Sequence, residues 1–417
     1  MRTKPQTSVW SVAIAAVLAV HAVHPTLAQV PTAGSGERLT IVPPTAGAYL
    51  GQHASGPSDD LATFEQSVGK KVALWSPYQV MTGQEPGEGV LSFDVRAAER
   101  AWAEGYPVFV GAYEATPLHR PFTVDKLLRG EYDRELGKLA QQFRQFGKPL
   151  FFSTAREPNA VLASHMGGFG PDGERSMSWA TANGRGLEDF LPSKFPNPAL
   201  YEGLGDAAVC DGIERLVAAQ RYYFDFFVRR EGLNFLTFDT MAWAAHINPV
   251  PADPESVMGR CARFEDFYRG LEGYADWVTI TWYPSVDDDL REPATSFFVN
   301  RLNTVMQMVR RVAPNKPVMI MELGFCGNLS LRAERIDATM DSIVRDHPDI
   351  RAVALWGSNP WGGPLTDCLI KPGSREAAAF KEIMELHPGY FRSCVRFSDG
   401  STMPNCQEDH PPRSLRR

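Results

Sequence analysis

The chain has 417 residues, of which 22% are charged, and its formal net charge is −7. This mildly acidic balance excludes a nucleic-acid-binding protein, which needs a basic face, and it fits an uncharged substrate better than a polyanionic one. A chain of this length usually forms two or three domains, but α/β barrels of similar length form a single domain.

The first 28 residues are typical of a secretory signal peptide. Arg2 and Lys4 precede the apolar run 10–20, and Thr26-Leu27-Ala28 predicts cleavage after Ala28. An uncleaved anchor helix is the alternative, although the run is short for a membrane-spanning helix. Cleavage would leave 417 − 28 = 389 residues and a charge of −7 − 2 = −9. We therefore expect a secreted or periplasmic protein without stable membrane insertion.

Residues 29–45 are rich in Pro, Gly, Ser and Thr, which predicts a linker. Short apolar, β-prone runs then alternate with helical stretches through residues 46–392, as in repeated βα units. The eight predicted strands are 47–51, 71–78, 106–114, 148–157, 233–240, 276–284, 316–325 and 351–359.

Helical spacing of apolar residues predicts helices between these strands, the clearest at 124–146, 213–228, 298–312 and 375–386. Eight strands that alternate with helices predict an α/β fold, a (β/α)8 TIM barrel that forms one catalytic domain over 46–392. An open doubly wound sheet is the alternative, but no glycine-rich dinucleotide motif follows the first strand. Two long insertions, 158–205 and 241–263, would lie at the C-terminal face, where barrel enzymes build their active sites.

The six cysteines predict disulfides, because their number is even and the chain has an export signal. We expect sequential pairing, Cys210–Cys261, Cys326–Cys368 and Cys394–Cys406, with free buried thiols as the alternative. The last pair would close a small loop in the C-terminal tail, 393–417. No cysteine or histidine spacing indicates a zinc site.

Two of the predicted strands share a pattern of Lys-Pro, an apolar run and a glutamate. The glutamates are Glu157 and Glu322, at the ends of the fourth and seventh strands. In a barrel both would lie at the same mouth, and two facing carboxylates are the minimum equipment for cleaving a glycosidic bond. Each could instead cap a helix or pair with an arginine such as Arg156.

A series of short motifs runs through most of residues 46–390. They are Gly47-Ala48-Tyr49-Leu50-Gly51, Tyr113-Glu114, Gly147-Lys148-Pro149, Arg156-Glu157-Pro158-Asn159, Tyr274-Ala275-Asp276-Trp277-Val278 with Tyr283, Glu322-Leu323-Gly324, and Trp356 with Asn359. In type and order this series resembles glycoside hydrolase family 26, a family of retaining (β/α)8 glycosidases that act on β-mannans and on some β-glucans and xylans.

The resemblance implies a role for each matching residue. Glu157 would be the proton donor and acid/base, and Glu322 the nucleophile that forms a covalent glycosyl-enzyme. Tyr283 would orient Glu322, and Asn159 would bind a sugar hydroxyl or else cap the next turn. Further substrate contacts are expected from five side chains, although the aromatic ones could equally be core packing: Arg156, Tyr113, Glu114, Trp282 and Trp356.

The chain departs from the family pattern at two places. The family commonly has a histidine where Arg156 stands, and an adjacent cation would lower a carboxyl pKa unless it points away. The fifth strand, which usually ends in tryptophan, here ends in Phe238-Asp239-Thr240. Asp287-Asp288-Asp289 could bind Ca²⁺ but are more typical of a solvated turn. His53 and His165 lie in predicted rim loops and have no metal-ligand spacing.

The sequence therefore predicts an exported retaining glycoside hydrolase that cleaves a β-linked polysaccharide internally. A β-mannan is the first choice, and a β-glucan or an exopolysaccharide is next. The alternative is a non-catalytic or weakly active carbohydrate-binding barrel. We expect no cofactor, no bound metal, no nucleic-acid partner and a monomeric state.

Overall fold

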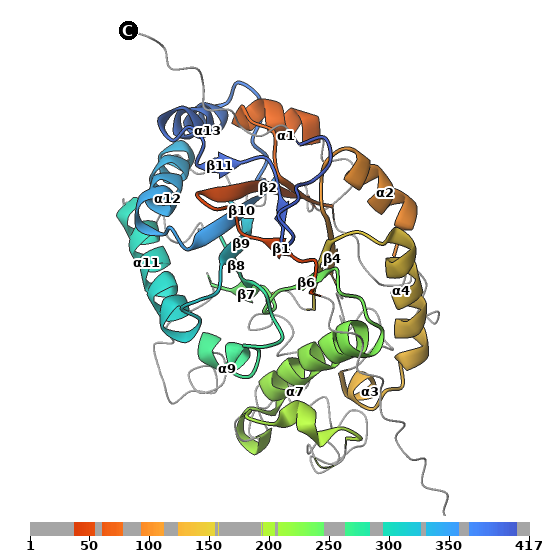
Figure 1. Cartoon of the computed structure of the whole chain (residues 1–417). Coiled ribbons are helices and arrows are strands. Elements are labelled where there is room, and N and C mark those ends of the chain that lie inside the picture. Colours follow the sequence, from red (N-terminus) through yellow and green to blue (C-terminus); the bar gives the residue numbers. More distant parts are fainter. Residues whose placement is uncertain are drawn as a thin grey trace, which may run out of the picture.

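The computed structural model describes residues 37–54, 61–77, 93–111, 124–154, 157, 193, 195–204, 207–245, 263–283, 295–326, 331–357 and 367–406. Strands occupy the centre of the molecule and helices surround them (Figure 1). The eight central strands are β2 (Ala48–Ala54), β3 (Leu74–Pro77), β4 (Val108–Gly111), β5 (Leu150–Ser153), β6 (Leu236–Phe238), β8 (Val278–Trp282), β9 (Val318–Leu323) and β10 (Ile350–Trp356).

Each central strand is followed by helix. In chain order these segments are α1 (Leu61–Val68), α2 (Val95–Ala103), α3 (Val124–Leu128) with α4 (Asp133–Phe146), α7 (Ala207–Phe224), α9 (Phe264–Tyr268), α11 (Thr295–Val312), α12 (Arg332–Asp346) and α13 (Arg375–Leu386). A short 3₁₀ turn, η5 (Pro198–Tyr201), precedes α7, and the π-helical segment η6 (Asp225–Arg230) extends it.

Parallel pairing groups the central strands into two sheets that are arranged around a ring. One sheet runs β3-β2-β10-β9-β8 and adds the two-residue strand β7 (Trp243–Ala244), while a second sheet runs β4-β5-β6. A parallel bridge between Asp239 and Trp277 connects β6 to β8, and β3 contacts β4. The protein is thus an α/β protein of the (β/α)8 class, as the strand count predicted.

Alternating side chains on each strand divide the core into two layers. Outward-facing residues such as Val278, Ile280 and Ile320 pack with the helices in one large apolar cluster. Inward-facing residues form a second cluster in the ring interior, where the rings of Phe109 and Phe151 stack with centroids 4.5 Å apart. The barrel is therefore filled by side chains, and chemistry is confined to its rim.

The predicted helix over 124–146 is broken in the structure. Gly130 has a φ of 74°, in the left-handed region that glycine adopts readily, so α3 ends before it. The second part, α4, buries Leu136, Leu139 and Phe143 at helical spacing and ends at Gly147, which also has a positive φ of 62°. The prediction over 375–386 is confirmed, since α13 covers those residues.

The ends of the described chain close the barrel at the N-terminal ends of its strands. Strand β1 (Ile41–Val42) pairs antiparallel with β12 (Arg396–Phe397), and β11 (Phe391–Arg392) extends β2. The Trp277 indole donates a hydrogen bond to the carbonyl of Ile41 at 2.9 Å. Residues 37–45 are therefore part of the folded unit, and the prediction that they end a linker is wrong.

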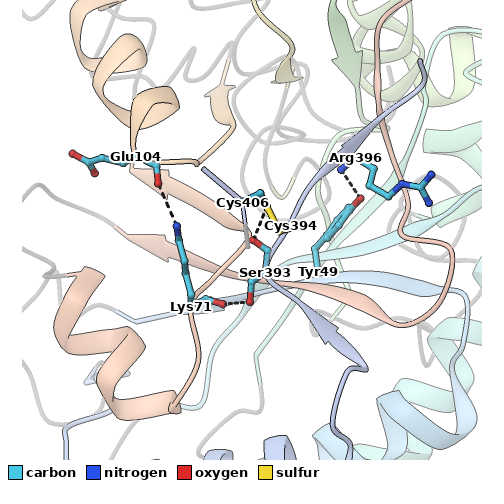
Figure 2. Close-up of a disulfide and its surroundings, with 7 residues drawn as sticks. All are labelled: Tyr49, Lys71, Glu104, Ser393, Cys394, Arg396 and Cys406. Atoms are coloured by element: carbon cyan, nitrogen blue, oxygen red, sulfur yellow. Dashed lines mark hydrogen bonds between the residues drawn. A yellow bond between two sulfur atoms is a disulfide. The ribbon is translucent and has the colours of Figure 1, made fainter. Parts of the chain in front are cut away.

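A disulfide fastens this floor of the barrel (Figure 2). Cys394 and Cys406 are bonded, and the neighbouring Ser393 hydroxyl donates to the carbonyl of Lys71 at 2.7 Å. Tyr49 accepts a hydrogen bond from the Arg396 amide at 3.0 Å. The Cys326–Cys368 disulfide is also present, so two of the three predicted pairings are confirmed. Cys261 lies outside the described residues, as do residues 407–417 of the predicted tail.

Candidate active site

Glu322 is a buried carboxylate near the C-terminal end of β9, with no exposed surface. The Tyr283 hydroxyl donates a hydrogen bond to its Oε2, and Nε2 of His53 lies 3.3 Å from its Oε1. Tyr283, just beyond β8, thus binds one carboxylate oxygen, and His53 of β2 lies close to the other. Tyr283 therefore makes the hydrogen bond to Glu322 that an orienting role would require.

A β-bulge in β9 turns Glu322 toward the barrel interior. Ile320 pairs with Ile280 of β8, but Thr281 pairs with Glu322, so β9 contains one extra residue. Simple alternation after the outward-facing Ile320 would turn Glu322 outward, among the helix-facing side chains. Bulges are common beside active sites because they redirect a side chain in this way. The glutamate therefore shares the inner face with Thr281.

Glu157 lies just beyond β5, in an unusual backbone conformation. Its φ is 47°, which few non-glycine residues adopt, and its amide donates to the carbonyl of Ala242 at 2.6 Å. Its Oε1 accepts a hydrogen bond from the Thr281 hydroxyl at 2.8 Å. Unlike Glu322, Glu157 is partly exposed.

Thr281 links the two glutamates. Its hydroxyl binds Glu157, and its Cα is the register partner of Glu322 on the adjacent strand. Neighbouring strands are about 4.8 Å apart. Both carboxylates therefore converge on the same short stretch of β8 at the C-terminal rim.

An aromatic group lies beside Glu322. Trp356 stacks on His53 with ring centroids 5.3 Å apart and meets the Tyr283 ring edge-on at 6.5 Å. Trp356 is only 5% exposed. Gly324 leaves space for the Tyr283 ring, since a Cβ at this position would overlap it.

His53 was expected in a rim loop, but it is a buried residue of β2. The predicted strand ended three residues too early, at Gly51 instead of Ala54. The signal was present in the alternation of Tyr49, Gly51 and His53 along one face.

Trp282 does not join the other predicted site residues. It is 1% exposed and belongs to the outer cluster, on the opposite face of β8 from Thr281 and Tyr283. Its predicted contact with a sugar is wrong for that reason. The predicted residues Tyr113, Glu114, Arg156 and Asn159 lie outside the described residues, as do His165 and Asp287-Asp288-Asp289.

Asp239, at the end of β6, is a further buried carboxyl that the sequence did not assign to the site. Its two oxygens accept hydrogen bonds from the Met241 amide and the Thr279 hydroxyl, both at 3.0 Å. Burial raises the pKa of Asp239 to about 6, although hydrogen bonds from Ser153, Met241 and Thr279 oppose the shift. Asp239 therefore changes its charge near neutral pH.

Two features are absent from the described residues. These residues contain no group of three or more His, Cys, Asp or Glu side chains placed to hold a metal ion. Among the same residues, no helix combines the length and apolar character needed to cross a membrane.

Comparisons with known proteins give similarity at the level of structure. No family model and no curated protein matches the sequence. The endo-1,4-β-mannanase of Rhizomucor miehei is similar with a TM-score of 0.51 and 10% identity, over 84% of this chain and 99% of that one. A modular endo-β-1,4-mannanase of Cellulomonas fimi gives 0.49 and 14%, over 88% of this chain and 75% of that one. Mannanase BCman of Bacillus subtilis gives 0.46 and 15%, over 79% and 85%. The likeness to the Rhizomucor protein supports the barrel fold.

Proposed function

We propose that this chain is an exported retaining glycoside hydrolase of the family 26 type, which cleaves a β-linked polysaccharide internally. The observation that carries the proposal is the convergence of Glu157 and Glu322 on Thr281. Two carboxyl groups at one end of a barrel, one buried and one partly exposed, suit the two steps of double displacement.

In the first step, Glu322 attacks the anomeric carbon while Glu157 donates a proton to the departing glycosidic oxygen. The bond between that carbon and the oxygen breaks, and a glycosyl ester forms on Glu322. Tyr283 and His53 hold the carboxylate in one orientation, so less reorganisation is needed when it attacks.

In the second step, the ionised Glu157 accepts a proton from water, and the resulting hydroxide displaces Glu322 from the sugar. Two inversions at the same carbon retain its configuration. Glu157 is suited to this exchange because it is partly exposed, whereas Glu322 is fully buried.

A β-mannan is the first candidate substrate, and a β-glucan or an exopolysaccharide is next. The mannanases with similar folds and the motif order support this choice. Export is supported by the signal-like first 28 residues and by the two disulfides, which persist in oxidising compartments.

A non-catalytic carbohydrate-binding barrel is the second candidate. The observation that favours it is Arg156, which adjoins Glu157 in sequence where the family commonly has a histidine. A cation close to a carboxyl lowers its pKa and so weakens it as a proton donor.

Release of reducing sugar from mannan, lichenan, xylan and curdlan tests both candidates. The wild type should release sugar from at least one polymer, and Glu322→Ala should lose about 10⁴-fold or more of that activity. Glu135→Gln, a change on the outer helix α4, is the matched control and should be fully active. Undiminished release by Glu322→Ala would disprove the nucleophile assignment. Polymer binding without any release by the wild type would favour the carbohydrate-binding protein.

A further inference from the structure

Asp239 connects three strands beneath the position of Glu157. Besides the carboxyl contacts with Met241 and Thr279, the Asp239 amide donates a hydrogen bond to the carbonyl of Phe152 in β5 at 3.4 Å. The side chain is 2% exposed. Asp239 therefore binds groups from β5, from β8 and from the turn that follows β6.

The turn after β6 holds the backbone of Glu157. Asp239 fixes the amide of Met241, whose φ of 69° is in the left-handed region. The next residue, Ala242, accepts the hydrogen bond from the Glu157 amide. Two non-glycine residues of this hydrogen-bonded path, Met241 and Glu157, thus have positive φ, a conformation that persists only where surrounding contacts enforce it.

The second contact of Asp239 supports the side chain of Glu157. Thr279 and Thr281 are two positions apart in β8, so both side chains lie on its inner face. Thr279 binds Asp239 and Thr281 binds Glu157. Both the backbone and the carboxylate of Glu157 are therefore held by segments to which Asp239 is hydrogen-bonded.

We infer that Asp239 is the positioning residue for Glu157, because it fixes both the Met241–Ala242 turn and the strand that carries Thr281. Its kinetic consequence rests on the proposed function, in which Glu157 protonates the leaving group. The fifth strand ends in Asp239 where the resembled family usually has tryptophan, so this support belongs to the chain's own sequence.

Kinetics with two leaving groups test the inference. A misplaced proton donor slows cleavage of a polymer, whose leaving group needs a proton, much more than cleavage of a 2,4-dinitrophenyl β-mannobioside or β-cellobioside, whose leaving group does not. Asp239→Ala should lower kcat/KM by about 10-fold to 100-fold on the polymer and by less than about 3-fold on the dinitrophenyl glycoside. Asp239→Asn keeps an oxygen that accepts from the Met241 amide, and its NH2 group can donate to the Thr279 hydroxyl oxygen, so it should restore polymer activity to within about 3-fold.

Asp276→Asn is the matched control. Asp276 also accepts a backbone hydrogen bond, from Phe238 at 2.8 Å, and it pairs with Arg38, but it lies at the floor of the barrel. This variant should lower kcat/KM on both substrates by the same small factor. Equal losses on both substrates for Asp239→Ala would overturn the inference and make Asp239 a purely structural residue.

A crystal structure of Asp239→Ala supplies a readout that does not depend on activity. We expect Glu157 to leave its positive φ and to lose the Thr281 contact. A variant structure with Glu157 unmoved would overturn the positioning role, whatever the kinetics. If the wild type cleaves none of the substrates, the proposed function is overturned. The crystal structure of Asp239→Ala then still decides whether Asp239 positions Glu157.

Discussion

The Thr281 hydroxyl donates a hydrogen bond to Oε1 of Glu157 at 2.8 Å, although the two residues are 124 positions apart in the chain. Thr281 also pairs in register with Glu322. A single threonine on β8 thus binds one proposed catalytic carboxylate and lies opposite the other glutamate in the sheet.

Replacement of Thr281 by valine keeps the β-branched shape and removes only the hydroxyl. We expect kcat/KM on the polymer substrate to fall by about 10-fold, because Glu157 loses the contact that orients it. Thr281→Ser keeps the hydroxyl and should remain within about 3-fold of the wild type. Steady-state kinetics of the three proteins decide the matter, and equal activity of Thr281→Val and the wild type would contradict the role of the hydroxyl.

Replacement of Gly324 by alanine should displace Tyr283 from Glu322, since the added methyl group would overlap the tyrosine ring. We expect kcat to fall by about 10-fold to 100-fold and the free energy of unfolding to fall by about 1–3 kcal/mol. Gly273→Ala is the matched control, because no heavy atom lies within 4 Å of a Cβ placed there. Its activity and midpoint of urea unfolding should equal those of the wild type. Unchanged kcat in Gly324→Ala would mean that Tyr283 does not need its observed position.

The raised pKa of Asp239 predicts a pH-dependent contribution to stability. The pKa rises from 3.8 to about 6 on folding, so the folded protein retains a proton that the unfolded chain has released. This contribution is fully present below the lower pKa and is lost as the pH rises through the upper one. Asp239→Asn does not titrate, so its stability relative to the wild type should increase by about 2 kcal/mol between about pH 4 and pH 7.

Urea unfolding at several pH values in this interval measures the difference between the two proteins. Only the change of this difference with pH is informative, since the substitution also alters the hydrogen bonds by a constant amount. A difference that stays constant with pH would show that Asp239 is ionised throughout.

Removal of the Cys394–Cys406 disulfide should loosen the floor of the barrel. The bonded cysteines are 12 residues apart, and a loop of this size contributes about 3 kcal/mol to stability. We expect the double serine variant to lose about that free energy of unfolding while its kcat at low temperature stays unchanged, because the floor lies at the end of the barrel opposite the glutamates. The Cys326–Cys368 disulfide is the comparison, because Cys326 lies two residues after Gly324, close to the proposed site. Loss of this disulfide should lower kcat as well as stability. Equal kcat losses in both variants would contradict this separation of roles.

The sequence predicted the barrel because strand and helix periodicities are local properties. It also located both glutamates, since Lys-Pro marks the start of each strand and the apolar run marks its length. The bulge that turns Glu322 inward could not be predicted, because an extra residue appears only when β9 is paired with β8 and β10. Thr281 and Asp239 were missed for a related reason, since their partners are distant in sequence.

The pairing of β1 with β12 joins residues 41 and 397. Contacts between such distant positions form late in folding, because a long loop must close first. The floor of the barrel can therefore be completed only after residue 397 has left the ribosome. A nascent chain that ends before β12 has the complete set of central strands but lacks the β1–β12 pairing below them. The synthesis of β12 thus determines when the floor of the barrel can be closed.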